Sequence, residues 1–140
     1  MSEKNKNIVR RLYVEVQNQG KVDVLDEIMH PDFREHGEAI LGESRGRETL
    51  KQTITAVRGI LPDLRVEIED IIAEGDMVGV RGLMRCTHLG EWLGAAPTGN
   101  EVSWRGLATF RVVDGKIVER WFNEDGLHIV QQFGIVPANY

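Results

Sequence analysis

The sequence has one cysteine, no long apolar run and no block of basic residues, and each shortage excludes a class of protein. A single thiol, Cys86, allows neither an intrachain disulfide nor a thiolate metal cluster. No apolar stretch approaches the length of a membrane-spanning helix, and the charged start is unlike a secretory signal. With 17 basic and 22 acidic residues the net charge is −5, so neither nucleic acid nor a membrane is an expected partner. These shortages predict a cytoplasmic protein.

Several motifs of well-known catalysts are also missing. The sequence contains no His-Glu-x-x-His zinc motif, no P-loop, no glycine-rich dinucleotide fingerprint and no Gly-x-Ser-x-Gly. We therefore predict no metal and no cofactor. Any chemistry would depend on carboxylate, imidazole and electrostatic effects.

The hydrophobic periodicity predicts one α+β domain over residues 1–140. Apolar residues recur at helical spacing in 5–19, 22–29 and 47–58. After Pro62 the period changes to two, which predicts strands near 64–69, at 77–88 and in a hairpin of 101–113 and 116–125, before a short helix at 127–133. Helices followed by long antiparallel strands predict one curved sheet closed on one side by helices.

The hairpin is centred on Asp114-Gly115, a pair typical of two-residue turns. Counting outward from this turn predicts which residues face one another and share one side of the sheet. Gly106 and Ala108 on that side are nearly without side chain, which would leave room for a ligand. A β-bulge would exchange the two sides beyond it. The predicted pairs are Val112 with Ile117, Phe110 with Glu119, Ala108 with Trp121, Gly106 with Asn123 and Trp104 with Asp125; the opposite side, including Arg120 and Glu124, is predicted to be solvated.

Asp125 is the sharpest catalytic candidate, because it ends a strand beside Trp104 and Trp121. A carboxyl against indole rings loses hydration, which raises its pKa toward values useful for acid/base catalysis. Asp125-Gly126 could equally begin the last helix, with Asp125 as its N-cap. The sequence leaves both interpretations open.

Two histidines are further candidates, although a lone histidine is more often structural than catalytic. His88 continues the apolar side of its strand, and His36 follows Phe33 on a piece expected near the open end of the sheet. Trp92, in the loop at 89–100, could be a lid over a pocket or a plug in the core. Glu119 could lie beside Phe110 and Trp121 or pair with an arginine at the sheet edge.

Six short motifs occur in an order that resembles one family. They are Gly75–Arg81, Thr87–Gly90, Gly94–Gly99, Asp114–Trp121, Asp125 and Gln132–Gly134. Together they resemble the SnoaL-like polyketide cyclases, or ester cyclases, from about residue 5 to residue 136.

The resemblance implies a cone-shaped α+β barrel of the nuclear-transport-factor and ketosteroid-isomerase type, usually dimeric, with a deep pocket. In these cyclases an aspartate in a Trp-x-x-x-Asp pattern acts as general acid/base in an intramolecular aldol ring closure without cofactor; residues 121–125 match that pattern. Characterised cyclases also use a histidine on the strand before the last one. Residues 101–113 contain none, and Thr109 and Arg111 stand in that region, so the imidazole would have to come from elsewhere, from His36 or His88.

The sequence therefore predicts a cofactor-independent, homodimeric polyketide cyclase for a small, hydrophobic, carbonyl-bearing substrate. Asn123 and His36 would donate hydrogen bonds to the developing oxyanion. The alternatives are a hydroxylase or hydrolase using the same pocket, and a non-catalytic binding dimer in which a tryptophan fills the pocket and Asp125 is solvated or bound to an arginine. The predicted catalytic residues are Asp125, His36 and His88, and the predicted substrate-binding residues are Phe33, Trp92, Trp104, Phe110, Glu119, Trp121 and Asn123.

Overall fold

The computed structural model describes residues 2–37 and 45–138, which form a five-stranded sheet with helices. No helix within these ranges is long and apolar enough to cross a membrane. The strands are β1 (Met29–His36), β2 (Arg65–Glu74), β3 (Met77–Thr87), β4 (Glu101–Val113) and β5 (Lys116–Glu124). The helices are α1 (Ser2–Arg11), its π-helical continuation η1 (Leu12–Gln17), η2 (Val22–Val24), α2 (Leu25–Ile28), α3 (Arg47–Ile60) and α4 (Gly126–Gln132).

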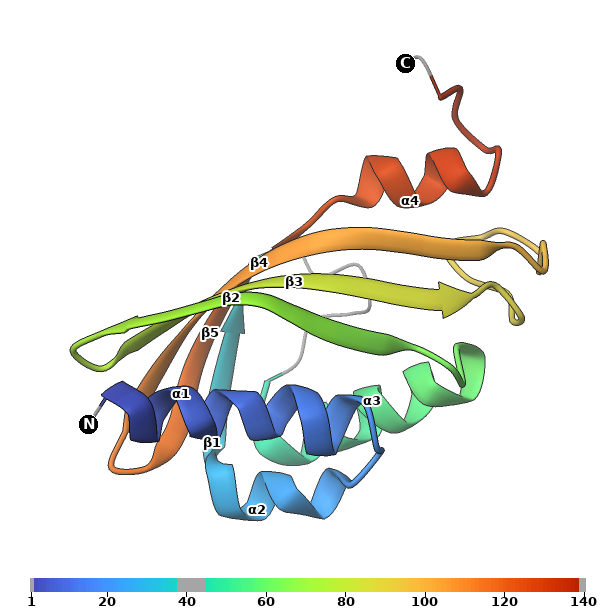
Figure 1. Ribbon diagram of the computed structural model, residues 1–140. Helices are drawn as coiled ribbons and strands as arrows, with labels where there is room; N and C mark the ends of the chain where they lie inside the picture. The colour runs from blue at the N-terminus through green and yellow to red at the C-terminus, as the bar shows by residue number, and fades with distance from the viewer. Residues whose placement is uncertain (1, 38–44, 139–140) are drawn as a thin grey trace.

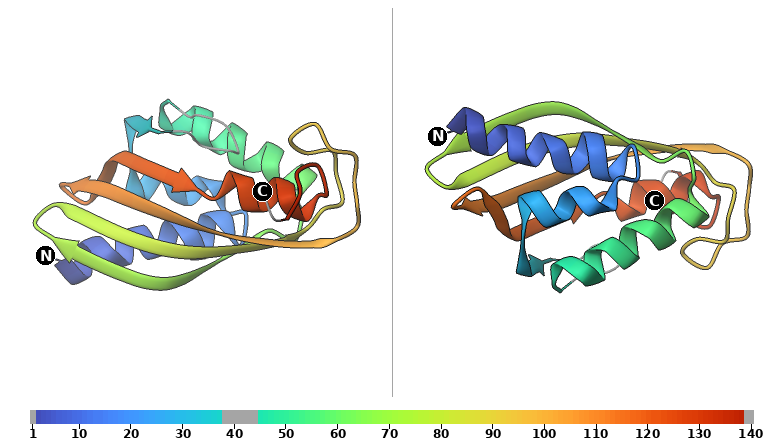
Figure 2. Two further views of the ribbon diagram at one scale, coloured as in Figure 1. Left: turned by 90° about the horizontal axis from the view of Figure 1, so that it is seen from above. Right: turned by 90° about the horizontal axis from the view of Figure 1, so that it is seen from below.

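The predicted α+β fold is confirmed: α1, α2 and α3 lie on one side of a curved sheet, and α4 lies beyond the end of β5 (Figures 1 and 2). We call the side of the sheet toward α1 and α3 the inner face. Apolar residues of α1, η1 and α3 pack against it and form the core with strand residues. The order β1-β5-β4-β3-β2 leaves two edges, so the sheet stays open. β2, β3, β4 and β5 pair antiparallel, as predicted for the strands after Pro62, whereas β1 runs parallel to β5.

The hairpin turn is confirmed, because Asp114 and Gly115 have φ angles of 50° and 76°. Val113 pairs with Lys116 across the turn, and the predicted pair of Val112 with Ile117 is confirmed. The next pair joins Arg111 to Glu119, which leaves Val118 as the extra residue of a β-bulge. Beyond this bulge the predicted register is wrong by one residue.

The shift exchanges the two sides of β5, since neighbouring residues of a strand point to opposite faces. Phe110 now pairs with Arg120 and Gly106 with Glu124. Because of the bulge, the side of β5 that was expected to face solvent faces the helices. The predicted inward positions of three residues are wrong, because they lie on the outer face: Glu119, Trp121 and Asn123.

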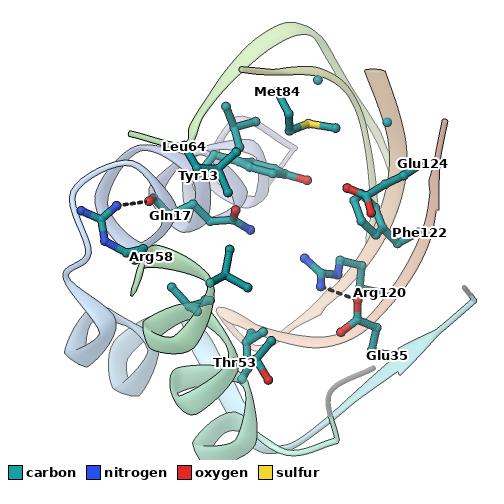
Figure 3. A pocket seen from close by; sticks show the side chains of 16 residues that line it. Tyr13, Gln17, Glu35, Thr53, Arg58, Leu64, Met84, Arg120, Phe122 and Glu124 are labelled. Atoms are coloured by element: carbon teal, nitrogen blue, oxygen red, sulfur yellow. Dashed lines mark hydrogen bonds and ion pairs between the residues drawn. The ribbon is translucent and has the colours of Figure 1, made fainter. Parts of the chain in front are cut away.

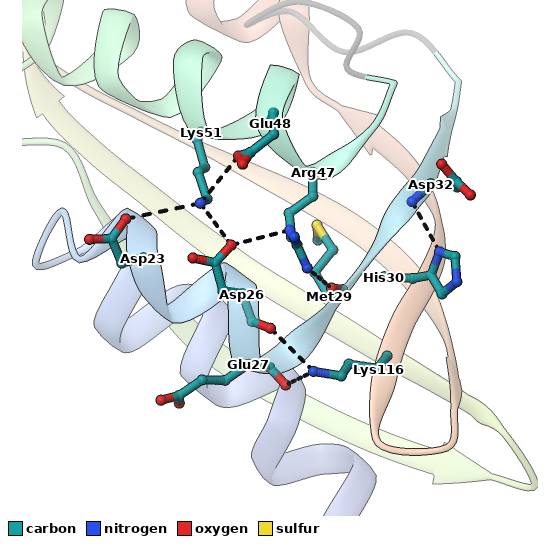
Figure 4. Close-up of polar contacts among 10 residues, drawn as sticks. All are labelled: Asp23, Asp26, Glu27, Met29, His30, Asp32, Arg47, Glu48, Lys51 and Lys116. Carbon is teal, nitrogen blue, oxygen red and sulfur yellow. Dashed lines mark hydrogen bonds and ion pairs between the residues drawn. The ribbon is translucent and has the colours of Figure 1, made fainter.

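A network of polar contacts fixes α2 against both α3 and the β4–β5 hairpin (Figure 4). Lys51 Nζ lies 2.8 Å from Asp26 Oδ1, and this hydrogen bond is the main cause that lowers the pKa of Asp26. Arg47 Nη1 donates to the Met29 carbonyl at 3.2 Å. Lys116 Nζ donates to the carbonyl oxygens of Asp26 and Glu27, at 3.2 and 2.7 Å. The network holds the helix that forms one wall of the pocket described below.

The last helix takes over hydrogen bonds that β5 no longer makes. β5 ends at Glu124, so on the β5 side no strand pairs with β4 at Ser103, whereas β3 still pairs with it on the other side. The Gln132 side chain fills this place: its Nε2 donates to the Ser103 carbonyl at 2.7 Å, and its Oε1 accepts from the Ser103 N–H at 3.0 Å. One amide side chain thereby anchors α4 along β4.

Candidate active site

A pocket of about 770 Å³, counting the part open to solvent, lies between η1, α3 and the inner face of the sheet (Figure 3). η1 contributes Tyr13 and Gln17, and α3 contributes Thr53 and Arg58. The strands contribute most of the remaining wall. The polar and aromatic strand residues of the pocket are Glu35 from β1 and Arg120, Phe122 and Glu124 from β5.

Two glycines form part of the pocket floor. Gly82 of β3 pairs with Gly106 of β4, and both line the pocket. A Cβ atom on Gly106 would lie 3.0 Å from Met84 Cε and 3.3 Å from the carbonyl oxygen of Asn123. Neighbouring protein atoms therefore crowd the place that a Gly106 side chain would take, and the prediction that Gly106 leaves room for a ligand stays a prediction. Ala108 is buried and is not part of the pocket lining.

Glu35 and Arg120 form a buried ion pair at the wall of the pocket (Figure 3). They are partners in the parallel register of β1 and β5, so their side chains leave the sheet on the same face. The exposed fractions of the two side chains are 1% and 7%. The guanidinium carbon of Arg120 also lies 5.0 Å from the centre of the Phe122 ring.

Glu124 is a second carboxylate in the pocket, and Trp104 holds it from the neighbouring strand. Trp104 is 1% exposed, and its Nε1 donates to Glu124 Oε1 at 3.1 Å. This hydrogen bond orients the carboxyl beside Phe122 and Gly106, which also line the pocket.

Tyr13 faces the strand carboxylates from η1 (Figure 3). Burial is the main cause that raises the pKa of Tyr13 to about 12; the charges of Glu124 and Glu35 raise it further, and that of Arg120 opposes them. The Tyr13 ring packs edge-on against Phe110, with centroids 6.0 Å apart. Its hydroxyl is therefore a neutral hydrogen-bond donor over the physiological pH range.

The raised pKa of Tyr13 predicts a loss of stability at alkaline pH. An unfolded tyrosine titrates near pH 10, so the folded protein binds this proton more tightly. The stabilisation of the folded state by this proton is complete below about pH 10 and is lost as the pH rises to about 12. The total loss in the free energy of unfolding is roughly 2–3 kcal/mol. Urea unfolding across this range should show a smaller pH dependence in Tyr13→Phe than in the wild type. Parallel curves for the two proteins would contradict the buried hydroxyl.

Asp125 lies outside the pocket, and its N-cap role is confirmed. The side chain is exposed, and Asp125 Oδ1 accepts a hydrogen bond from the His128 N–H at 3.1 Å, at the start of α4. The expected inward position beside Trp104 is wrong, because the bulge gives that place to Glu124. The catalytic role of Asp125 stays a prediction.

The cap predicts how Asp125 variants behave. Asp125→Ala should lower the free energy of unfolding by about 1 kcal/mol, because it removes the acceptor of the His128 N–H. Asp125→Asn keeps an oxygen acceptor and should stay within a few tenths of the wild type. Urea denaturation of the two variants measures the difference. Equal losses in both would show that charge, rather than the cap, carries the effect.

His36, Glu119 and Trp121 do come together, but on the outer face. His36 Nε2 lies 2.8 Å from Glu119 Oε2, and the rings of His36 and Trp121 stack with centroids 5.2 Å apart. Arg111 Nε lies 3.5 Å from Glu119 Oε1, so Glu119 has an arginine partner as expected, although β5 is an inner strand and not the expected edge of the sheet. The sheet separates this group from the pocket, and Asn123 is exposed on the same face.

Most other predicted site residues belong to the core. His88 is fully buried and stacks on Phe133 at 4.2 Å, while its Nδ1 lies 3.0 Å from Thr98 Oγ1. Trp92 packs against Trp104 at 5.3 Å, so it is a plug rather than a lid. Two further aromatic residues are buried outside the pocket lining, Phe33 and Phe110.

Four polar residues of the pocket were not predicted from the sequence: Tyr13, Glu35, Arg120 and Glu124. Glu35 had a usable signal: it stands two residues after the apolar Phe33, and alternate residues of a strand share a face. Within the described ranges no group of three or more histidine, cysteine or acidic residues could hold a metal ion.

Comparisons of the sequence and the structure with known proteins identify the family of this chain. The SnoaL-like polyketide cyclase family matches residues 7–133. Aklanonic acid methyl ester cyclase AcmA of Streptomyces galilaeus is 33% identical over 110 residues, covering 78% of this chain and 76% of its own. The crystal structure of IdmH, a candidate polyketide cyclase from Streptomyces antibioticus, superposes with a TM-score of 0.82 at 31% identity, covering 93% and 98% of the two chains. AclR, a candidate hydroxylase from S. galilaeus, also gives 0.82 at 28% identity, covering 96% and 87%. The chain belongs to the SnoaL-like polyketide cyclase family.

Proposed function

We propose that the protein closes a ring in a polyketide-type ester by intramolecular aldol addition, without a cofactor. One observation carries this proposal: a pocket in a SnoaL-like chain presents two carboxylates, a guanidinium and a neutral phenol to a space with apolar walls. Such a pocket suits a largely apolar molecule that carries a few carbonyl groups. The relative AcmA is named for a methyl ester of this kind.

In the proposed reaction Glu124 is the general base. It removes a proton from a carbon next to a carbonyl group, and the resulting enolate carbon attacks a second carbonyl of the same molecule. The proton then returns to the new alkoxide, so the product is an isomer of the substrate. Glu124 suits this role better than Glu35, because Trp104 orients its carboxyl whereas Arg120 neutralises Glu35.

Tyr13 would stabilise the oxygen that becomes negative during ring closure. A phenol that stays protonated at neutral pH can donate a hydrogen bond to this oxygen from its buried position. The homodimer and the cytoplasmic location remain predictions from the sequence.

The test is turnover of aklanonic acid methyl ester under argon, followed by liquid chromatography and mass spectrometry. We expect a ring-closed product of unchanged mass, formed faster than in buffer alone. Gain of an oxygen atom, only when air is admitted, would instead identify a hydroxylase, and gain of water a hydrolase. Binding without any change in the ester would favour the non-catalytic alternative.

A further inference from the structure

The Glu35–Arg120 pair keeps unused hydrogen-bonding atoms at the pocket. Arg120 Nη2 bonds to Glu35 Oε1, and both residues line the cavity. Among the described residues, none makes a hydrogen bond to Glu35 Oε2 or Arg120 Nε, although both atoms are inaccessible to solvent. Figure 3 shows the carboxyl and the guanidinium directed toward the pocket.

Stability alone gives little reason for such a pair. Buried polar atoms almost always have a partner, and an unmet one costs about 1–3 kcal/mol. Buried ion pairs are often no more stabilising than apolar residues of similar size. A pair that is more than nine-tenths buried, beside an open cavity and incompletely bonded, is better explained by a ligand that completes its hydrogen bonds.

The charges around the pair indicate what kind of ligand fits. Arg120 stands between two carboxylates, Glu35 across the strand pair and Glu124 four residues along β5. The other cation of the lining, Arg58, lies across the cavity and donates to the carbonyl oxygens of Gln17 and Asn18. This end of the pocket therefore has an excess of negative charge, which disfavours an anionic ligand.

We propose that Glu35 and Arg120 position a neutral group that carries a hydrogen-bond acceptor and a donor side by side, such as an enol next to a carbonyl. The guanidinium donates to the carbonyl oxygen, and the Glu35 carboxylate accepts from the hydroxyl. The pair then holds an enolised 1,3-dicarbonyl near Glu124 and rejects a free carboxylate. The identity of this group as part of a substrate rests on the proposed function, whereas the binding preference does not.

Three small probes that share the naphthalene ring separate the effects of charge from those of hydrogen-bond donors and acceptors. 2-Naphthamide is neutral and offers acceptor and donor, methyl 2-naphthoate offers only acceptors, and 2-naphthoate is an anion. Titration calorimetry at neutral pH should give the amide a dissociation constant about 10-fold or more below those of the ester and the acid, the ratio expected for one well-placed hydrogen bond.

A charge-removing variant tests the residue assignment. In Glu35→Gln the guanidinium loses its counter-charge, so 2-naphthoate should bind about 10-fold or more tightly than in the wild type and become the preferred probe. Glu69→Gln is the matched control, because Glu69 pairs with Arg105 at 2.8 Å away from the pocket lining. It should leave all three constants unchanged.

Equal affinities for the three probes in the wild type, or no binding of any, would overturn the proposal even if Glu35→Gln fails to fold. An unchanged order in a folded Glu35→Gln variant, checked by circular dichroism, would overturn it as well. All these experiments measure binding, so their outcome does not depend on whether the protein turns over the ester. A protein that ranks the probes as expected but leaves aklanonic acid methyl ester unchanged would refute the proposed function and keep this inference.

Discussion

Arg120→Met is expected to lower the free energy of unfolding by about 3–5 kcal/mol, the usual cost of leaving a buried charge without its partner. The side chain of Glu35 is 1% exposed, so the carboxylate left behind has little contact with water. Methionine keeps most of the aliphatic volume, which limits the loss of packing. Urea denaturation at neutral pH measures the change.

The double variant Glu35→Leu/Arg120→Met separates lost charge pairing from lost packing. Removing both charges should recover most of the stability, since an apolar pair of similar volume is often neutral or stabilising. Arg105→Met is the control for an exposed pair and should cost at most about 1 kcal/mol. A loss below about 1 kcal/mol in Arg120→Met would show that the pair is solvated in solution.

Glu124→Gln is expected to reduce turnover by about 10²–10⁴-fold, the usual contribution of a general base. The amide keeps an oxygen that can accept from Trp104 Nε1, so the fold and the shape of the pocket should persist. Steady-state kinetics on the ester would locate the loss in kcat rather than in KM.

Asp125→Asn makes the matched comparison, because it removes the same charge from the neighbouring residue. The geometry predicts turnover within a few-fold of the wild type, since Asp125 caps α4 outside the pocket. The opposite pattern, with a large loss in Asp125→Asn and little in Glu124→Gln, would restore the assignment made from the Trp-x-x-x-Asp motif.

The sequence was sufficient for the parts of the fold that local chemistry decides. The Asp114-Gly115 turn, the strand periods and the helical spacing all depend on neighbours along the chain. The bulge at Val118 does not. Residues 117–124 read Ile-Val-Glu-Arg-Trp-Phe-Asn-Glu, in which either set of alternate residues holds two apolar and two polar side chains. Periodicity therefore could not say which set faces the helices.

That ambiguity determined what the sequence could say about the site. Strict counting from the turn placed Trp121 and Asp125 inside and Arg120 and Glu124 in solvent, and one extra residue reverses both assignments. Glu35 was missed for a different reason. A buried carboxylate is favoured only when a cation lies opposite, and its cation is 85 residues away on a strand that runs parallel to β1.

The amide of Gln132 has a consequence for the behaviour of the protein in concentrated solution. Where β4 runs past the end of β5, the N–H and C=O of Ser103 would offer a free edge to which a strand of another molecule could add. Gln132 occupies both groups from within the same chain. This one side chain thus prevents a strand of another molecule from pairing with β4 at Ser103. Many proteins protect such an edge with a charged residue or a proline instead.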